Sequence, residues 1–462
     1  MRRAAAVSER VRPRDAAFAA LAVALCLLVG RLLPGRLEAL SHAKLLLLPA
    51  ALALALAAGW LALAHPFRAF VLGFALLGIV DVQPAPVDVV FALLLAASVA
   101  TTRTTPRVPA FVALPLAGFL LATLASMTAA VSFSRAVSFE GITVYLVALA
   151  VWLSSALARA RWAHAAVKTY IWVAVGSAAL GPLALYLHLP PSHLLLYGGR
   201  LRAEGLFKDP NVYSAFLVPA AVILLEELTT PRILRWRRRT LVALFAVVSV
   251  GVLVAYSRAA WLNDALAVTT LIVVQSSRRG GLRRALKTLL VLAAGAAAGL
   301  GVLAATGSLS FLEQRSRFQS YDTSRFSNQS AAFSDMYRHA FGYGPGQTEL
   351  LRPLSTHSSY VRAAFEQGVP GLATLLLVFG GTLLCAALLA RRTEAVNGVG
   401  TAALLGIWVG LVANSFFIDT LHWRHLWIMA ALIWCSYSQA FERRLALRPL
   451  VAARLRAAPG AA

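Results

Sequence analysis

Apolar stretches long enough to cross a membrane recur along nearly the whole of this 462-residue sequence. A helix that spans the hydrocarbon core of a bilayer needs about 17–25 mostly apolar residues. Hydrophobic residues make up 59% of the chain and charged residues only 13%, which is more apolar than a single soluble core can use. The pattern predicts an all-α polytopic integral membrane protein and excludes a soluble enzyme, a disordered chain and a fibrous protein. The fourteen candidate stretches are residues 16–33, 43–64, 67–81, 86–101, 109–128, 139–158, 166–188, 212–228, 240–256, 259–275, 286–305, 370–390, 399–417 and 422–440.

Two of these stretches, 67–81 and 86–101, are shorter than a full crossing, so we expect tilted helices or a re-entrant pair. The sequence therefore predicts 12–14 transmembrane helices, and both counts give the same orientation downstream. Five arginines precede the stretch 16–33. Because no small-residue cleavage site follows it, we expect a retained membrane anchor rather than a signal peptide.

The distribution of lysine and arginine predicts the orientation of the chain. If the N-terminus is cytoplasmic, 28 of the 43 basic residues fall in segments on the cytoplasmic side. This excess follows the positive-inside rule, so both termini are expected in the cytoplasm. The net charge is +24. We expect the excess basic residues to contact membrane lipids and an anionic substrate rather than nucleic acid.

Two segments on the outer side, 189–211 and 306–369, contain most of the sequence outside the membrane. They hold nine of the 15 outer basic residues, and an anionic ligand would explain this charge. A structureless loop of about 60 residues is uncommon unless it is functional, so we expect short helices near 325–340 and 358–367. The predicted organisation is transmembrane helices over 1–305, a large outer loop over 306–369, transmembrane helices over 370–440 and a basic cytoplasmic tail over 441–462.

The first outer loop contains a cationic motif. Arg200, Arg202 and Lys208 lie within nine residues of one another. Asp209 or Asn211 is suited to cap a helix that begins near residue 212, and a helix N-terminus attracts anions. We therefore expect the three cations and Asn211 to bind an anionic substrate. The alternative is a basic loop whose long side chains only reach the lipid headgroups.

A second candidate is Arg258, which follows Tyr256 and Ser257 at the outer boundary of an apolar stretch. An ionisable residue at such a boundary is costly and is a functional candidate for that reason. The planar guanidinium suits phosphate because it can donate two parallel hydrogen bonds. The alternative is a structural ion pair with a carboxylate such as Asp264 or Glu204.

The third candidate region begins with the glycine-rich segment 342–346, which is typical of a tight turn. His357 follows in a polar segment, and a histidine can accept a proton at neutral pH. Tyr360, three residues later, is expected on the same helix face, and Tyr360 and Glu366 are further candidates for substrate binding. His339 is the competing outer histidine. The alternative for an isolated histidine is an ordinary surface position.

The cysteines and histidines do not suggest a metal or a disulfide framework. Cys26, Cys385 and Cys435 all lie in apolar stretches, and none has the spacing of metal ligands. No pair of histidines has a metal spacing supported by nearby carboxylates. We expect no structural metal and no cofactor.

Three motifs carry a resemblance to a known family. They are R-x-x-G-x-F-x-x-P-N at 202–211, S-R-x-x-x-L at 257–262, and G-x-G-P-G-x-x-E followed by H-S-x-Y and E-x-G-x-x-G within 342–371. Together and in this order they resemble the O-antigen ligase family, which also contains O-antigen polymerases and bacterial O-oligosaccharyltransferases. The resemblance implies a GT-C-like glycosyltransferase fold in the bacterial inner membrane, with an active site on the periplasmic side.

The resemblance also implies a reaction and residue roles. Such a ligase takes O-antigen polysaccharide from undecaprenyl pyrophosphate and transfers it to lipid A–core, which completes lipopolysaccharide. Arg202 and Arg258 match the arginines that would hold the pyrophosphate. His357 matches the histidine that would act as general base in an inverting displacement without a metal.

Two other functions stay open. A polymerase or a protein O-oligosaccharyltransferase would share the donor site and differ only at the acceptor, although the short basic tail favours the ligase. A transporter or flippase for an anionic lipid would place charges near the bilayer midplane. The carboxylates of this sequence lie mostly near predicted helix ends, which favours the glycosyltransferase.

Overall fold

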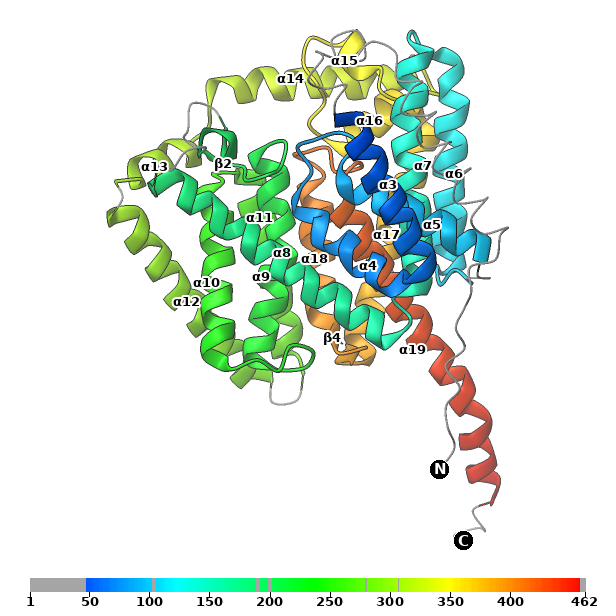
Figure 1. Ribbon diagram of the computed structural model, residues 1–462, viewed down its shortest axis with the longest axis vertical. Helices are drawn as coiled ribbons and strands as arrows, with labels where there is room; N and C mark the ends of the chain where they lie inside the picture. The colour runs from blue at the N-terminus through cyan, green and yellow to red at the C-terminus, as the bar shows by residue number, and fades with distance from the viewer. Residues whose placement is uncertain are drawn as a thin grey trace. The chain divides into compact units, whose positions relative to one another are not determined.

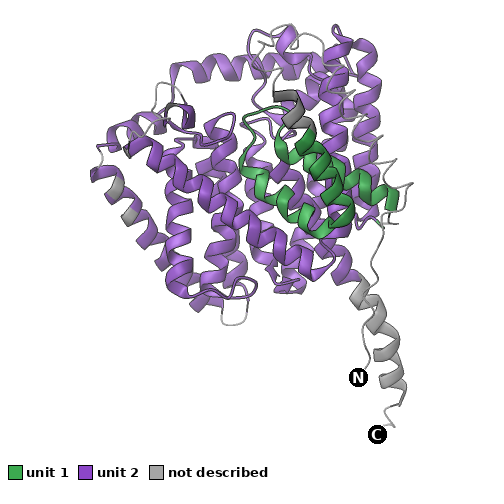
Figure 2. Cartoon of the chain, in the orientation of Figure 1, with its two compact units in different colours: residues 1–105 green, residues 106–462 purple. Residues whose placement is uncertain are grey.

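The computed structural model describes residues 47–457, apart from 102–104, 188–191, 198–201, 279–280 and 306. The chain divides into two compact units, Met1–Thr105 and Pro106–Ala462 (Figure 2). The predicted anchor at 16–33, Cys26 and Arg200 lie outside the described residues. Each unit is therefore considered by itself.

Unit 1 contains three helices in its described part, and one of them is short. They are α3 (Leu47–Ala64), α4 (Pro66–Ala75) and α5 (Pro86–Thr101), with a 3₁₀ turn, η1 (Leu76–Gly78), after α4. At 1.5 Å per residue, the ten residues of α4 extend about 15 Å, roughly half the hydrocarbon core. A Cβ on Gly73 would lie 2.6 Å from the ring of Phe91, so glycine lets α4 approach α5 closely.

Unit 2 contains the remaining long helices, and every predicted apolar stretch after residue 105 coincides with one of them. Seven helices described in this unit, α6 to α9, α11, α12 and α17, are long and apolar enough to cross a membrane. The chain is thus an all-α protein with the architecture of a polytopic membrane protein, while the count of 12–14 spans stays a prediction. The long helices are α6 (Ala110–Ser126), α7 (Phe133–Ala156), α8 (Ala160–Leu187), α9 (Pro210–Thr229), α10 (Arg238–Val254), α11 (Arg258–Ser276), α12 (Gly281–Ala305), α17 (Gly368–Arg392), α18 (Thr401–Asn414) and α19 (Arg424–Ala457).

The core of unit 2 is built around α9, which is buried along most of its length and packs against α8, α10, α11 and α18. The pair α11 and α18 approaches closely because small residues line the contact. A Cβ on Gly406 would lie 2.3 Å from the carbonyl oxygen of Ala267, and one on Gly410 would lie 2.2 Å from Oδ1 of Asn263.

Short polar elements gather at one end of unit 2, where α14 runs across the ends of the long helices (Figure 1). The predicted helix at 358–367 is confirmed within one residue by α16, whereas the helix predicted at 325–340 begins five residues earlier as α14. Gln319 starts α14 through a reciprocal capping box with Asp322, and glutamine is not among the usual N-cap residues. These elements are the hairpin of β1 (Leu196–Tyr197) and β2 (Arg202–Ala203), η2 (Met127–Ala129), η3 (Ser192–Leu195), α13 (Leu309–Ser316), α14 (Ser320–Ser334), η4 (Asp335–Tyr337), α15 (Thr348–Leu351) and α16 (Ser359–Glu366). The opposite end carries a second hairpin, β3 (Ala395–Val396) and β4 (Val399–Gly400).

Candidate anion-binding site

The segment 189–211 leads into α9 at Asp209, which is the N-cap of that helix. One carboxylate oxygen of Asp209 accepts hydrogen bonds from the backbone N–H groups of Asn211 (2.6 Å) and Val212 (3.2 Å). The cap that was expected at Asp209 or Asn211 is therefore confirmed at Asp209. This leaves the side chain of Asn211 free of capping and available to neighbouring residues.

Asn211 joins the first motif to the second. Its Oδ1 accepts hydrogen bonds from Oγ of Ser257 (2.7 Å) and, at 3.5 Å, from the guanidinium of Arg202. Arg202 also donates through Nε to the carbonyl of Ala255 (3.0 Å). The pKa of Arg202 is lowered to about 10, first by burial and second by the neighbouring charge of Arg315. The arginine stays charged at neutral pH.

Arg258 is the first residue of α11, and it pairs with a residue of the large loop. Its two terminal nitrogens contact the carboxylate of Asp322 at 2.6 and 2.9 Å. The alternative interpretation of Arg258, an ion pair with a carboxylate, is thus confirmed, but the carboxylate is Asp322 rather than Asp264 or Glu204. Asp264 lies six residues further along α11, about 9 Å deeper along the helix axis, whereas Asp322 is brought to the helix end by α14.

The helix α14 also reaches His357. Arg325 follows Asp322 by three residues and so lies on the same face of α14. Its guanidinium donates to the carbonyl of His357 at 3.5 Å and to the carbonyl of Phe417. Because Asp322 holds Arg258 and Arg325 holds the backbone of His357, these two predicted site residues are linked through a single turn of α14.

The imidazole of His357 is exposed and electrostatically suited to be neutral. Partial burial among protein atoms, and next the charge of Arg325, lower its pKa below the usual value of 6.5. Arg362 acts in the same direction, and the carboxylates of Asp209 and Asp419 oppose it. A neutral imidazole at pH 7 can accept a proton.

Two other predicted substrate-binding residues are placed differently from the expectation. Because α16 begins at Ser359, His357 precedes the helix, and the expected shared helical face with Tyr360 is wrong. The hydroxyl of Tyr360 donates instead to the carbonyl of Val412 (2.9 Å). Glu366 is fully buried and accepts hydrogen bonds from Thr348 and from the N–H of Gly346 (2.9 Å), so it holds the glycine turn in place.

The remaining candidates stand at the surface. Lys208 is exposed beside Asp209. His339 is exposed, and its ring packs at a tilt against that of Tyr343, with ring centroids 4.2 Å apart. For both residues a role in substrate binding stays a prediction.

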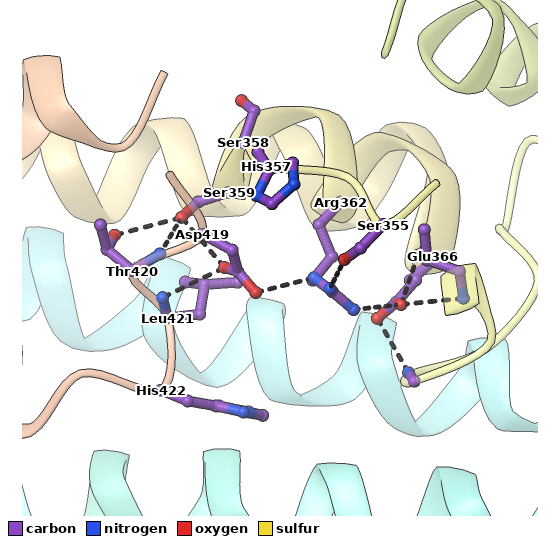
Figure 3. A network of polar contacts seen from close by, with 12 residues as sticks. Ser355, His357, Ser358, Ser359, Arg362, Glu366, Asp419, Thr420, Leu421 and His422 are labelled. Atoms are coloured by element: carbon purple, nitrogen blue, oxygen red, sulfur yellow. Dashed lines mark hydrogen bonds and ion pairs between the residues drawn. The ribbon is translucent and has the colours of Figure 1, made fainter. Parts of the chain in front are cut away.

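A buried network centred on Arg362 lies beside His357 (Figure 3). Arg362 contacts Glu366 at 2.7 Å, Asp419 at 2.7 Å and Glu349. Burial alone would raise the pKa of Glu349, but Arg362 outweighs it and lowers the value to about 2. Ser359 extends the network, because its Oγ donates to Asp419 (3.2 Å) and accepts from the N–H of Thr420 (2.8 Å). The network therefore fixes the segment that carries His357.

Sequence reasoning missed several residues that the fold brings to this site. Arg315 donates to the hydroxyl of Tyr321 (3.3 Å), which also accepts from Arg258 (3.2 Å). The abundance of basic residues in the loop pointed to the region, but no local pattern distinguished Arg315 and Arg325 from their neighbours. We define the cationic cluster as the four guanidinium groups of Arg202, Arg258, Arg315 and Arg325, which gather around Tyr321 together with the carboxylates of Asp209 and Asp322. The four guanidinium groups of the cluster outnumber these two carboxylates.

An apolar groove begins beside the segment that carries His357. Its cavity has a volume of about 660 Å³. It extends from α14 and α16 down to Leu383 of α17 and Val409 of α18. Its lining residues are Phe326, Gln329, Phe333, Ser358, Tyr360, Val361, Leu383, Val409, Val412, Ala413, Phe416 and Phe417.

The structure thus defines a polytopic membrane protein of the all-α class with a cationic cluster at one end of its larger unit. Comparison with protein-family models finds no match, and no curated protein is significantly similar to the chain. Among the described residues, no three His, Cys, Asp or Glu side chains are grouped so that they could hold a metal ion.

Proposed function

We propose that this protein is a glycosyltransferase that transfers O-antigen polysaccharide from undecaprenyl pyrophosphate to lipid A–core, completing lipopolysaccharide. The observation that carries the proposal is the cationic cluster, in which Arg325 contacts the backbone of the exposed His357. The resemblance of the three motifs to the O-antigen ligase family supports the same function. Under this proposal the protein lies in the bacterial inner membrane with both termini in the cytoplasm, and the cationic cluster faces the periplasm.

The charge of the cluster suits the donor. A diphosphate linked to both a lipid and a glycan carries two negative charges, and the cluster offers four guanidinium groups to bind them. Guanidinium groups match phosphate oxygens through paired hydrogen bonds. As the glycosidic bond breaks, negative charge develops on the departing diphosphate, and donors that are already in place stabilise it. Arg202 and Arg258 would supply the central contacts, while Arg315 and Arg325 add charge from the large loop.

His357 is suited to activate the acceptor. In the proposed step, a hydroxyl oxygen of lipid A–core attacks the anomeric carbon of the glycan, and the hydroxyl proton passes to the imidazole of His357. The bond between the anomeric carbon and the phosphate oxygen breaks, and its electron pair leaves with undecaprenyl pyrophosphate. Attack from the face opposite the leaving group inverts the anomeric configuration. This step requires no cofactor.

The apolar groove suits the isoprenoid chain of the donor. Besides residues of α14 and α16, the groove is lined by Leu383 of α17 and by Val409, Val412 and Ala413 of α18. Burial of an apolar chain is favourable along such a lining. A lipid seated there would bring its diphosphate to the polar end of the groove, near Ser358 and His357.

The proposal is tested by transfer between purified lipid-linked O-antigen and lipid A–core in reconstituted membranes. We expect Arg258→Ala to lower the rate by about 10²–10³, as for the loss of one charge-stabilising donor. His357→Ala should lower it by about 10²–10⁴, as for the loss of a general base. Arg338→Ala, which removes an exposed arginine of the same loop, is the control. Wild-type transfer by both site variants at matched protein levels would show that the proposal is wrong.

The same assay separates the related functions. Incubation with a second lipid-linked glycan tests polymerase activity, and incubation with a protein acceptor tests O-oligosaccharyltransferase activity. Transfer to lipid A–core alone supports the ligase. Movement of labelled lipid across the bilayer without any transfer would indicate a flippase instead.

A further inference from the structure

The carboxylate of Asp322 occupies the position on Arg258 that a phosphate would take. It contacts both terminal nitrogens of the guanidinium, at 2.6 and 2.9 Å. Its side chain is only 3% exposed, and it also accepts a hydrogen bond from the N–H of Gln319 (2.8 Å). Asp322 is therefore held firmly in the paired geometry in which a guanidinium binds an oxyanion.

The other hydrogens of the Arg258 guanidinium are also engaged. A guanidinium has five N–H donors. One terminal nitrogen donates to the carbonyl of Arg317 as well as to Asp322, and the other donates to the hydroxyl of Tyr321 as well as to Asp322. Only the Nε hydrogen is left, so an incoming phosphate can engage the fork of Arg258 only by displacing Asp322.

This displacement has different consequences for different phosphates. A phosphodiester headgroup carries one negative charge. When it takes the place of Asp322, Arg258 exchanges one anionic partner for another, so little binding free energy is gained. A diphosphate brings a second negative charge, which the remaining cations of the cluster, Arg202 and Arg315, can bind at the same time. For a diphosphate, the new contacts to Arg202 and Arg315 thus offset the loss of the contact between Asp322 and Arg258. A single phosphate has no such gain.

We propose that Asp322 is a specificity-determining residue, an internal carboxylate that makes the cationic cluster accept diphosphates and reject the single-phosphate headgroups of membrane lipids. The need for such discrimination follows from location, because Arg258 begins a membrane-spanning helix and so lies where lipid phosphates are abundant. The inference rests on the proposed function and adds how the site selects its donor.

The experiment measures binding to purified full-length protein in a maltoside detergent, which carries no phosphate. The two probes are farnesyl diphosphate and dihexanoyl phosphatidylglycerol, a single phosphodiester. Each probe is compared with itself between wild type and Asp322→Asn, so differences between the lipid tails cancel. Asparagine keeps an acceptor for the N–H of Gln319 and removes only the charge. The matched control is Asp335→Asn, which removes a carboxylate paired with Arg352 in the same loop.

We expect Asp322→Asn to bind phosphatidylglycerol roughly tenfold more tightly, which corresponds to about 1.4 kcal/mol. Its affinity for farnesyl diphosphate should change much less, and the control should keep the wild-type preference. An unchanged preference in Asp322→Asn would overturn the inference. So would a loss of affinity for both probes by a variant with the wild-type unfolding temperature, because Asp322 would then only orient Arg258.

Transfer and binding together distinguish a failure of this inference from a failure of the proposed function. If wild type transfers glycan while Asp322→Asn keeps the preference for diphosphate, only this inference is wrong. If wild type does not bind farnesyl diphosphate, the inference is overturned together with the proposed function.

Discussion

At the end of unit 2 that carries β3 and β4, charged side chains hold chain segments together. Glu227, near the end of α9, accepts hydrogen bonds from three successive backbone N–H groups, those of Arg232 (2.9 Å), Ile233 (2.8 Å) and Leu234 (3.3 Å). Arg278 donates to the carbonyl of Ala390 (2.8 Å). These contacts close the connections between helices, and each joins a charge to a fixed group of the protein.

The opposite end of unit 2 contains both this arrangement and a different one. The network of Arg362 is again a set of fixed partners, with one cation among three carboxylates. In the cationic cluster, by contrast, Arg258 and Arg315 share the hydroxyl of Tyr321, and after burial the charge of Arg315 is the next cause that lowers the pKa of Arg202. Like charges that converge raise the free energy of the folded protein unless an anion binds between them. The comparison therefore distinguishes residues that stabilise the fold from residues suited to a ligand.

The largest expected effect on stability is at Arg362. Replacement by methionine would leave Glu349, Glu366 and Asp419 without their shared cation. We expect the free energy of unfolding to fall by about 3–5 kcal/mol, as when one partner of a buried ion pair is removed. Denaturation in increasing sodium dodecyl sulfate measures it, and Arg362→Lys, which keeps the charge, should lose less. Unchanged stability of Arg362→Met would contradict a structural role for the network.

A pair of arginines tests the comparison between the two ends directly. Arg202→Ala should lower glycan transfer by about 10²–10³ with little change in stability. Arg278→Ala should lower the free energy of unfolding by about 1–3 kcal/mol, because it leaves buried carbonyl groups without a donor, and the surviving folded protein should transfer at the wild-type rate. If both variants lose transfer equally at equal amounts of folded protein, the distinction between residues that stabilise the fold and residues suited to a ligand does not hold.

The features that depend on local sequence could be predicted. The apolar stretches predicted the helices because burial in a membrane requires a continuous apolar run. Asp209 was predicted as a cap because it lies directly before Pro210 and an apolar run, and capping acts over two or three residues. The helix α16 was also predicted within one residue, because a polar segment gives way to the apolar run after residue 368.

The pairings across the chain could not be predicted in this way. Asp322 is 64 residues from Arg258, and it reaches that arginine only because α14 begins at Gln319 and crosses the end of unit 2. The nearer carboxylate, Asp264, was the natural choice from sequence alone. Arg362 and Asp419 belong to different segments that meet at the start of α16, so their ion pair has no signal in the local pattern.

A smaller effect is expected at Glu227. Glu227→Gln keeps one acceptor oxygen but places a donor against backbone N–H groups, so we expect the free energy of unfolding to fall by about 1–3 kcal/mol. Glycan transfer by the folded variant should be unchanged. The matched control is Glu313→Gln in the exposed pair with Arg317, which should lose less than about 1 kcal/mol. A loss of transfer without a loss of stability would place Glu227 in the functional machinery and break the comparison.

The smallest expected effect is a shift in the pH profile of transfer, and its sign follows from the charges around His357. Because the neutral imidazole is the active form, kcat/KM should rise with pH through the pKa of His357 and level off above it. Burial lowers that pKa most, Arg325 and Arg362 lower it further, and Asp209 and Asp419 raise it, so that the pKa lies below 6.5. Arg325→Gln should therefore move the rising limb to higher pH, whereas Asp209→Asn, which keeps a capping residue, should move it to lower pH. Shifts of both variants in the same direction would contradict this account. The two substitutions remove charges of opposite sign, so only an electrostatic effect on His357 moves the two profiles in opposite directions.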